Sequence, residues 1–338
     1  MTDARIQLWL APGVALAYPF ALSGFHAAVT PAPSGAWAWL AAAASLTIAF
    51  AAPALALLMA MRLAESGEAT IARRLATWVA LLAVASPPMF TMLGVVLYMF
   101  HDPVPDTWVW VGLWAILLAL VLLADDTVPA PSAAQPISAK LRVSHGIAAL
   151  AVVLVFLGFH IANHLFGLLG PESHAAVMKL GRVVYRAAVV EPVLVLLFLA
   201  LVAGGLRLVW LRLASPADRF RTLQMASGIY LVFFVLGHMN SVFIFARSYL
   251  GIDTGWGFAT GAPAGLIHDA WNIRLIPHYA LGVFFVLTHL ASGGRVVMMA
   301  HGGKAMLADR LLFASAWLAG AVALAIILGM CGMRLGTV

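Results

Sequence analysis

Histidines inside long apolar stretches of this chain have the residue type and the spacing to bind a haem iron. His160 and His238 lie at matching depths in two such stretches, and His289 lies in a third. An imidazole within a hydrocarbon layer about 30 Å thick needs a partner. Two histidines on neighbouring helices are a common way to hold haem between them. The pattern therefore predicts axial ligation of iron.

His160 and His238 form the first candidate pair. At 1.5 Å per residue, His160 comes about 26 Å along a predicted helix over 143–169, and His238 about 24 Å along one over 222–246. Both helices run in the same direction across the membrane, so the two imidazoles reach one level. The alternative role for this pair is hydrogen bonding between helices.

A helix predicted over 276–300 carries further imidazoles at two depths. His289 lies about 20 Å along it, and His278, eleven residues earlier, falls on the same face because eleven steps of about 100° come to roughly three turns. His289 has no obvious second ligand, so a polar packing contact is its alternative role. His164, one turn beyond His160 on the same face, suits a haem propionate, a quinone oxygen or water.

The composition sets the class of the elements that position these residues. Hydrophobic residues make up 64% of the 338 and charged residues 9%, and the mean hydropathy is +1.01. Soluble domains are about 45–50% apolar and about 25% charged. We therefore expect an all-α integral membrane protein in contact with the lipid bilayer. Its nine predicted transmembrane helices are 7–26, 36–61, 75–100, 107–124, 143–169, 188–211, 222–246, 276–300 and 311–333.

The distribution of cations predicts an orientation. With the N-terminus inside, thirteen of the 19 Lys and Arg fall in inner segments and six in outer ones. The positive-inside rule then favours a bacterial inner-membrane protein with its N-terminus in and its C-terminus out. A net charge of +6 suggests nucleic acid in a soluble chain, but here the cations lie beside helix ends, where they contact anionic lipid. Nucleic-acid binding is excluded on that ground.

Other chemistries find little support in the sequence. The single cysteine, Cys331, excludes an intrachain disulfide and a Cys-ligated iron–sulfur cluster. The chain shows no Gly-rich phosphate loop, no zinc spacing and no Ser/His/Asp set in catalytic order. Charged residues inside the spans are rare, which argues against a carboxylate proton relay.

A Pro/Ala/Ser linker divides the chain into two regions. It occupies 127–141 and cannot continue a helix through its prolines. Residues 1–126 form a four-helix region, which is either a degenerate repeat of the second half or like it by chance. Residues 142–338 form a five-helix bundle that carries the candidate ligands.

Residues 142–333 resemble the cytochrome b membrane-anchor subunit of succinate dehydrogenases and fumarate reductases, the succinate:quinone oxidoreductase family. The likeness rests on His160 and Asn163 followed by Gly170-Pro171-Glu172, on Gln224 to Gly228 with His238 ten residues later, and on His289. The resemblance implies two stacked haems, with His160 and His238 on the outer one and His289 on the inner one. It also implies flavoprotein and iron–sulfur partner subunits.

The chain departs from that family in its second helix. The family takes the partner of the inner-haem histidine from this helix, whereas the matching segment 193–205 here has no His, Met, Cys or Lys. We therefore expect one haem b. At the outer level, polar groups for a quinone site are Asn163, His164, Glu172, Asn240 and Arg274.

The sequence thus predicts a membrane b-type cytochrome that transfers electrons between a quinone or quinol and a partner subunit. It is at most the electron-transfer subunit of an oxidoreductase complex, and no residue of the chain is expected to be catalytic. The alternative is a non-respiratory membrane binding or assembly protein, with or without haem, that retains the fold. The ligand-poor first half and the missing inner ligand favour this alternative, and the histidine pattern opposes it.

Overall fold

The computed structural model describes residues 3–30, 35–65, 70–131, 136–213, 215 and 217–336, and the regular elements among them are all helical. Among these described residues, eight helices are long and apolar enough to cross a membrane, and a bent pair makes up to nine. This confirms the all-α membrane fold and the number of spans predicted from hydropathy.

The first half consists of α1 (Asp3–Val29), α2 (Ala36–Glu65), α3 (Ile71–Val84), α4 (Ser86–Met99) and α5 (Asp106–Leu123). Alanines let α1 and α2 approach closely, and Ala11, Ala15, Ala49 and Ala56 are fully buried. Small residues serve this purpose between membrane helices, where helix association depends on van der Waals packing.

The third expected span is broken, whereas the sequence predicted one helix over 75–100. The chain turns by 68° between α3 and α4. Pro87 and Pro88 follow the break and lack the N–H groups that would continue the α3 hydrogen bonds. The prolines free the carbonyls of Ala83 and Val84, and the Ser86 hydroxyl donates to that of Ala83, so part of the freed backbone is satisfied locally.

The second half contains five longer apolar spans. The first comprises α6 (Ala139–Val152), a π-helical turn at Val153–Leu157, α7 (Gly158–Leu165) and a 3-10 turn at Phe166–Leu169. The others are α9 (Val190–Arg212), α10 (Arg219–Met239) continued by a π-helical stretch at Asn240–Leu250, α13 (Leu275–Ala300) and α14 (Ala305–Met330).

Two segments expected to be loops contain helices. α8 (Pro171–Tyr185) connects the first and second of these spans, and its His174, Met178, Arg182 and Tyr185 face the bundle interior. The stretch after Arg247 is largely helical too, with α11 (Trp256–Thr260), α12 (Gly265–His268) and a 3-10 turn at Asn272–Arg274. These short helices contain too few apolar residues to show in a hydropathy profile.

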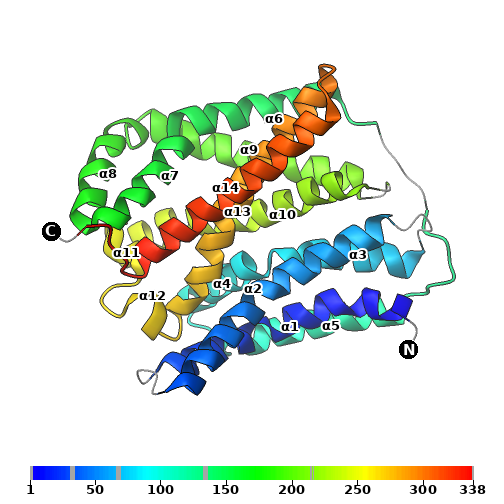
Figure 1. Cartoon of the computed structure of the whole chain (residues 1–338), viewed down its shortest axis with the longest axis horizontal. Helices are drawn as coiled ribbons and strands as arrows, with labels where there is room; N and C mark the ends of the chain where they lie inside the picture. The colour runs from blue at the N-terminus through cyan, green and yellow to red at the C-terminus, as the bar shows by residue number, and fades with distance from the viewer. Residues whose placement is uncertain are drawn as a thin grey trace.

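The two halves meet along α10. Figure 1 shows α1 to α5 on one side of α10 and α6 to α9 on the other, and α10 contacts α2, α3, α4, α9 and α13. A buried ion pair between Arg274 and Asp106 also joins the halves. Gly94 on α4 makes room for it, because a Cβ there would lie 2.5 Å from Arg274 Nη1 and 2.6 Å from Asp106 Oδ2.

Candidate functional site

A cavity of about 1400 Å³ runs between α6, α7, α8, α9, α10 and α13. Its walls are mostly apolar, and histidines gather in two groups along it. We call one group the His160 end (His160, His164, His174, His238 and His278) and the other the His289 end (His145 and His289). Single ligands occupy pockets of roughly 300–1,000 Å³, so this cavity has room for more than one.

His160 and His238 face each other at the His160 end, as their equal depth predicted. Their ring centroids are 6.1 Å apart. Each ring lies beside a phenylalanine one helical turn earlier, Phe156 for His160 at 4.7 Å and Phe234 for His238 at 5.8 Å, with nearly parallel planes. These contacts restrict the rotation of both imidazoles.

This geometry fits two ligands of one haem iron. Rings on opposite sides of one metal have centres about 6.4 Å apart, since each metal–nitrogen bond is about 2.1 Å and the nitrogen lies about 1.1 Å from the ring centre. The His160 and His164 rings are closer, at 4.7 Å, and come from the same face of one helix, so they cannot ligate from opposite sides. His160 and His238 are therefore the pair that fits.

His164 and His174 continue the imidazole group from this pair toward the end of the bundle. Their ring centroids are 5.3 Å apart, and the His174 ring lies 4.6 Å from that of Trp256. The Asn163 amide donates to His174 Nε2 at 3.1 Å, which places the His174 proton on Nδ1. Burial, with a smaller contribution from the Arg182 charge, lowers the pKa of His174 to about 4, so this imidazole is neutral at pH 7.

His278 and His289 both line the cavity, as their eleven-residue spacing predicted. His278 is buried at the His160 end, with its ring centroid 4.8 Å from that of Phe234. His289 is in the second group, where its Nδ1 lies 2.8 Å from the Ser227 hydroxyl oxygen. This hydroxyl also lies 2.8 Å from the Leu223 carbonyl, to which it donates, and so accepts the Nδ1 proton. The lone pair of His289 is then on Nε2, which lies 3.4 Å from the Gln224 amide nitrogen.

The residues expected at a quinone site are dispersed. Asn163 and His164 line the cavity. Glu172 is exposed on α8, and Asn240 is half-buried at the end of α10. Arg274 forms an ion pair with Asp106, and its guanidinium carbon lies 4.4 and 4.9 Å from the ring centroids of Phe90 and Trp271. The structure therefore brings together the imidazoles and Asn163, but not the other three residues.

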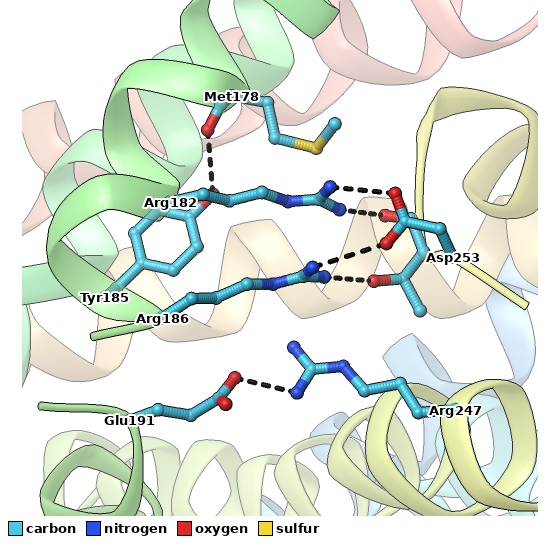
Figure 2. A network of polar contacts seen from close by, with 8 residues as sticks. Met178, Arg182, Tyr185, Arg186, Glu191, Arg247 and Asp253 are labelled. Carbon is cyan, nitrogen blue, oxygen red and sulfur yellow. Dashed lines mark hydrogen bonds and ion pairs between the residues drawn. The ribbon is translucent and has the colours of Figure 1, made fainter. Parts of the chain in front are cut away.

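A network of arginines borders the cavity beside α8 (Figure 2). Arg182 and Arg186 both pair with Asp253, at 2.8 and 3.3 Å, and donate to Thr254. Hydrogen bonding from Arg182 is the main cause of the lowered pKa of Asp253. A separate pair, Glu191 with Arg247 at 2.8 Å, connects the start of α9 to the end of the π-helical stretch after α10.

Two cavity histidines, His174 and His145, were not among the ligands predicted from the sequence. His174 lies in α8, where the four-residue steps His174, Met178 and Arg182 mark a face that lines the cavity. His145 is the third residue of the predicted helix 143–169, whereas α6 begins at Ala139, more than a turn earlier. A further usable signal is the Phe-x-x-x-His spacing that Phe156–His160 and Phe234–His238 share.

The described residues contain no group of three or more His, Cys, Asp or Glu side chains placed to hold a bare metal ion. A haem is different, because the porphyrin supplies four of its ligands and the protein supplies two. No family model, curated protein or solved structure matches this chain. The fold and the cavity define an all-α membrane protein with eight or nine candidate spans.

Proposed function

We propose that this protein is a membrane b-type cytochrome, with His160 and His238 as the axial ligands of a haem. The observation that carries the proposal is the facing of these two imidazoles, 6.1 Å apart, across an apolar cavity. If these histidines instead served to hydrogen-bond neighbouring helices, their ring nitrogens would contact a polar partner. Neither ring has such a partner among the described residues.

The residues around the site position and insulate this redox group. Phe156 and Phe234 hold the imidazole planes, and the apolar walls exclude water. The haem itself would supply one-electron chemistry. Oxidation of a quinol releases two electrons, which the haem would take one at a time, and two protons; His174, with a pKa of about 4, is too weak a base to hold either proton at pH 7. The electron donor or acceptor on the other side is a partner subunit of the flavoprotein and iron–sulfur kind.

A reduced-minus-oxidised optical spectrum with haem quantitation tests this function. Purified wild-type protein is expected to show a low-spin b-type spectrum, and His160→Ala and His238→Ala are each expected to lose the haem at this site. His26→Ala is the matched control, because His26 is an imidazole at the end of α1, near the carbonyl of His268 and away from the cavity.

Wild-type protein from haem-replete cells that contains no haem would overturn the proposal. The cavity would then be a binding site for another apolar ligand, which is the non-respiratory alternative. Haem that persists with unchanged spectrum in both single variants would show that the wrong histidines have been assigned.

A further inference from the structure

The imidazole of His238 is held by a phenylalanine whose own position depends on a glycine of another helix. Phe234 precedes His238 by one turn of α10, and their ring centroids are 5.8 Å apart with planes only 10° from parallel. Gly282 on α13 lies directly against one edge of the Phe234 ring. A Cβ there would lie 2.2 Å from Cε2, 2.4 Å from Cζ and 2.8 Å from Cδ2. Packed carbon atoms lie about 3.5–4.0 Å apart, so the ring fits only because residue 282 has no side chain.

The Phe234 ring has other neighbours that restrict it. Tyr230, one turn earlier on α10, has its ring centroid 6.2 Å away, with planes 28° from parallel. His278, one turn before Gly282 on α13, has its ring centroid 4.8 Å away. Tyr230 and His278 are both buried, and the Tyr230 hydroxyl donates to the His278 carbonyl at 3.1 Å, which ties α10 to α13 at this level. A Phe234 ring pushed away from α13 must therefore turn, and it then loses its parallel contact with His238.

The second imidazole of the pair is fixed without α13. The His160 ring lies 4.7 Å from that of Phe156, with planes 22° from parallel. Tyr185 of α8 and Phe198 of α9 contact the Phe156 ring edge-on, with centroids 5.3 and 5.9 Å away and planes at 89°. The His160 ring thus provides a reference plane that a change on α13 leaves in place.

The planes of the two imidazoles cross at 66°. The π orbital of an axial imidazole interacts with one of two iron d orbitals, and the ring plane decides which. Parallel rings act on the same d orbital and separate the pair in energy, whereas crossed rings act on both and leave the pair nearly equal. The axial ligands are one of the levers by which a protein tunes a haem. A ferric low-spin haem between these rings would therefore give an EPR signal dominated by one strongly shifted low-field line.

We propose that Gly282 is a positioning residue for the haem. It admits the Phe234 ring, which fixes the plane of the His238 imidazole and so the angle between the two axial ligands. This inference rests on the proposed function, because it concerns the ligand planes of that haem. It gives α13 a part in the His160 end of the cavity that does not depend on a ligand from α13.

EPR spectra of the oxidised, haem-loaded protein, together with haem quantitation, test the inference. In Gly282→Ala the haem content is expected to match the wild type, while the low-field line shifts and broadens because the His238 ring is no longer held in one plane. Phe234→Leu removes the parallel ring and is expected to change the line in the same way. Gly320→Ala on α14 is the matched control, since a Cβ there meets nothing within 4 Å, and it should leave the line unchanged.

The double variant Gly282→Ala/Phe234→Leu separates positioning from a general effect on packing. Its line is expected to match that of Phe234→Leu alone, because the ring that the added methyl group would displace is absent. A line that moves further in the double variant would overturn the inference, since Gly282 would then act by another route. An unchanged line in either single variant would overturn it too.

Loss of haem from Gly282→Ala would transfer the decision to the double variant. Haem regained there would support the inference, because a smaller residue at 234 makes room for the methyl group, and haem still absent would overturn it. A haem-loaded wild type with an unaltered line in Gly282→Ala overturns this inference alone. A wild type without haem overturns the proposed function as well.

Discussion

At the scale of single residues, His174 shows how burial sets a protonation state. Its ring is buried between His164 and Trp256, and its Nε2 accepts from the Asn163 amide. Protonation of this imidazole would place a cation beside Arg182 and break the Asn163 hydrogen bond. The pKa of about 4 has two causes, burial first and then the Arg182 charge.

The lowered pKa of His174 predicts that acid destabilises the protein. An unfolded histidine has a pKa near 6.5 and so binds a proton before the folded one does. The stabilising contribution is complete above about pH 6.5 and is lost as the pH falls from there toward 4. We expect the thermal midpoint in detergent to drop between pH 7 and pH 5, and to drop less in His174→Gln. His301→Gln, an exposed control, should follow the wild type, and an equal slope in all three proteins would contradict this assignment.

At the scale of elements, one ion pair lies where α4, α5 and the start of α13 meet. Arg274 Nη1 donates to Asp106 Oδ2, and the two side chains are only 8% and 18% exposed. Gly94 on α4 lies directly against both groups. Removing one charge of such a pair leaves the other buried without compensation.

We expect Asp106→Asn to lower the free energy of unfolding by about 3 kcal/mol, because a buried cation then lacks its counter-charge. The matched control is Asp253→Asn, whose carboxylate also pairs with arginines but is 64% exposed, so a loss under about 1 kcal/mol is expected. Denaturant or thermal unfolding in detergent measures both. A loss in Asp106→Asn no larger than in the control would show that the Arg274 pair contributes little.

A bulkier residue at the same contact gives a second prediction. Gly94→Val should destabilise the protein, because its side chain would overlap Arg274 and Asp106. Gly112→Val on α5 is the control, since a Cβ at Gly112 meets nothing within 4 Å. Thermal midpoints of the two variants should differ by several degrees. Equal midpoints would mean that α4 moves aside at little cost.

At the scale of the whole molecule, the cavity connects two histidine groups about 16 to 22 Å apart along its helices. The imidazoles of His164 and His174 and the amide of Asn163 gather at the His160 end only. A quinol that donates electrons there would find polar partners for its hydroxyls beside an apolar groove.

We expect a menaquinol analogue to reduce the haem at the His160 end of the oxidised protein in membranes. Slower reduction is expected in His164→Ala and His174→Gln, whereas Glu172→Gln, on the exposed face of α8, should match the wild type. Stopped-flow absorption of the haem gives the rates. Unchanged rates in both histidine variants would remove these residues from the quinol site, and no reduction by any quinol would favour the non-respiratory alternative.

Hydropathy predicted the spans because a membrane helix is selected by its composition over about 20 residues. Equal depth also predicted that His160 and His238 meet. His174 could not be found this way, since α8 is too polar and short to register as a span. His145 and His289 come to the same end of the cavity because of how α6, α9 and α13 pack, which no local pattern predicts. Segment 193–205 of α9 has no ligand, and its Gly204 and Gly205 pack against His145. Likewise, no local pattern indicates that Arg274 pairs with Asp106.

The pairing of Arg274 with Asp106 also has a consequence for biosynthesis. The two residues are 168 positions apart. At about 5–20 residues per second, the Asp106 carboxylate waits roughly 8–34 s on the ribosome-bound chain before its partner is made. Asp106 is the first residue of α5, so water can hydrate it during that interval. This ion pair therefore forms after α10, which also joins the halves, has been made, and the four N-terminal spans must remain inserted without it until Arg274 is made.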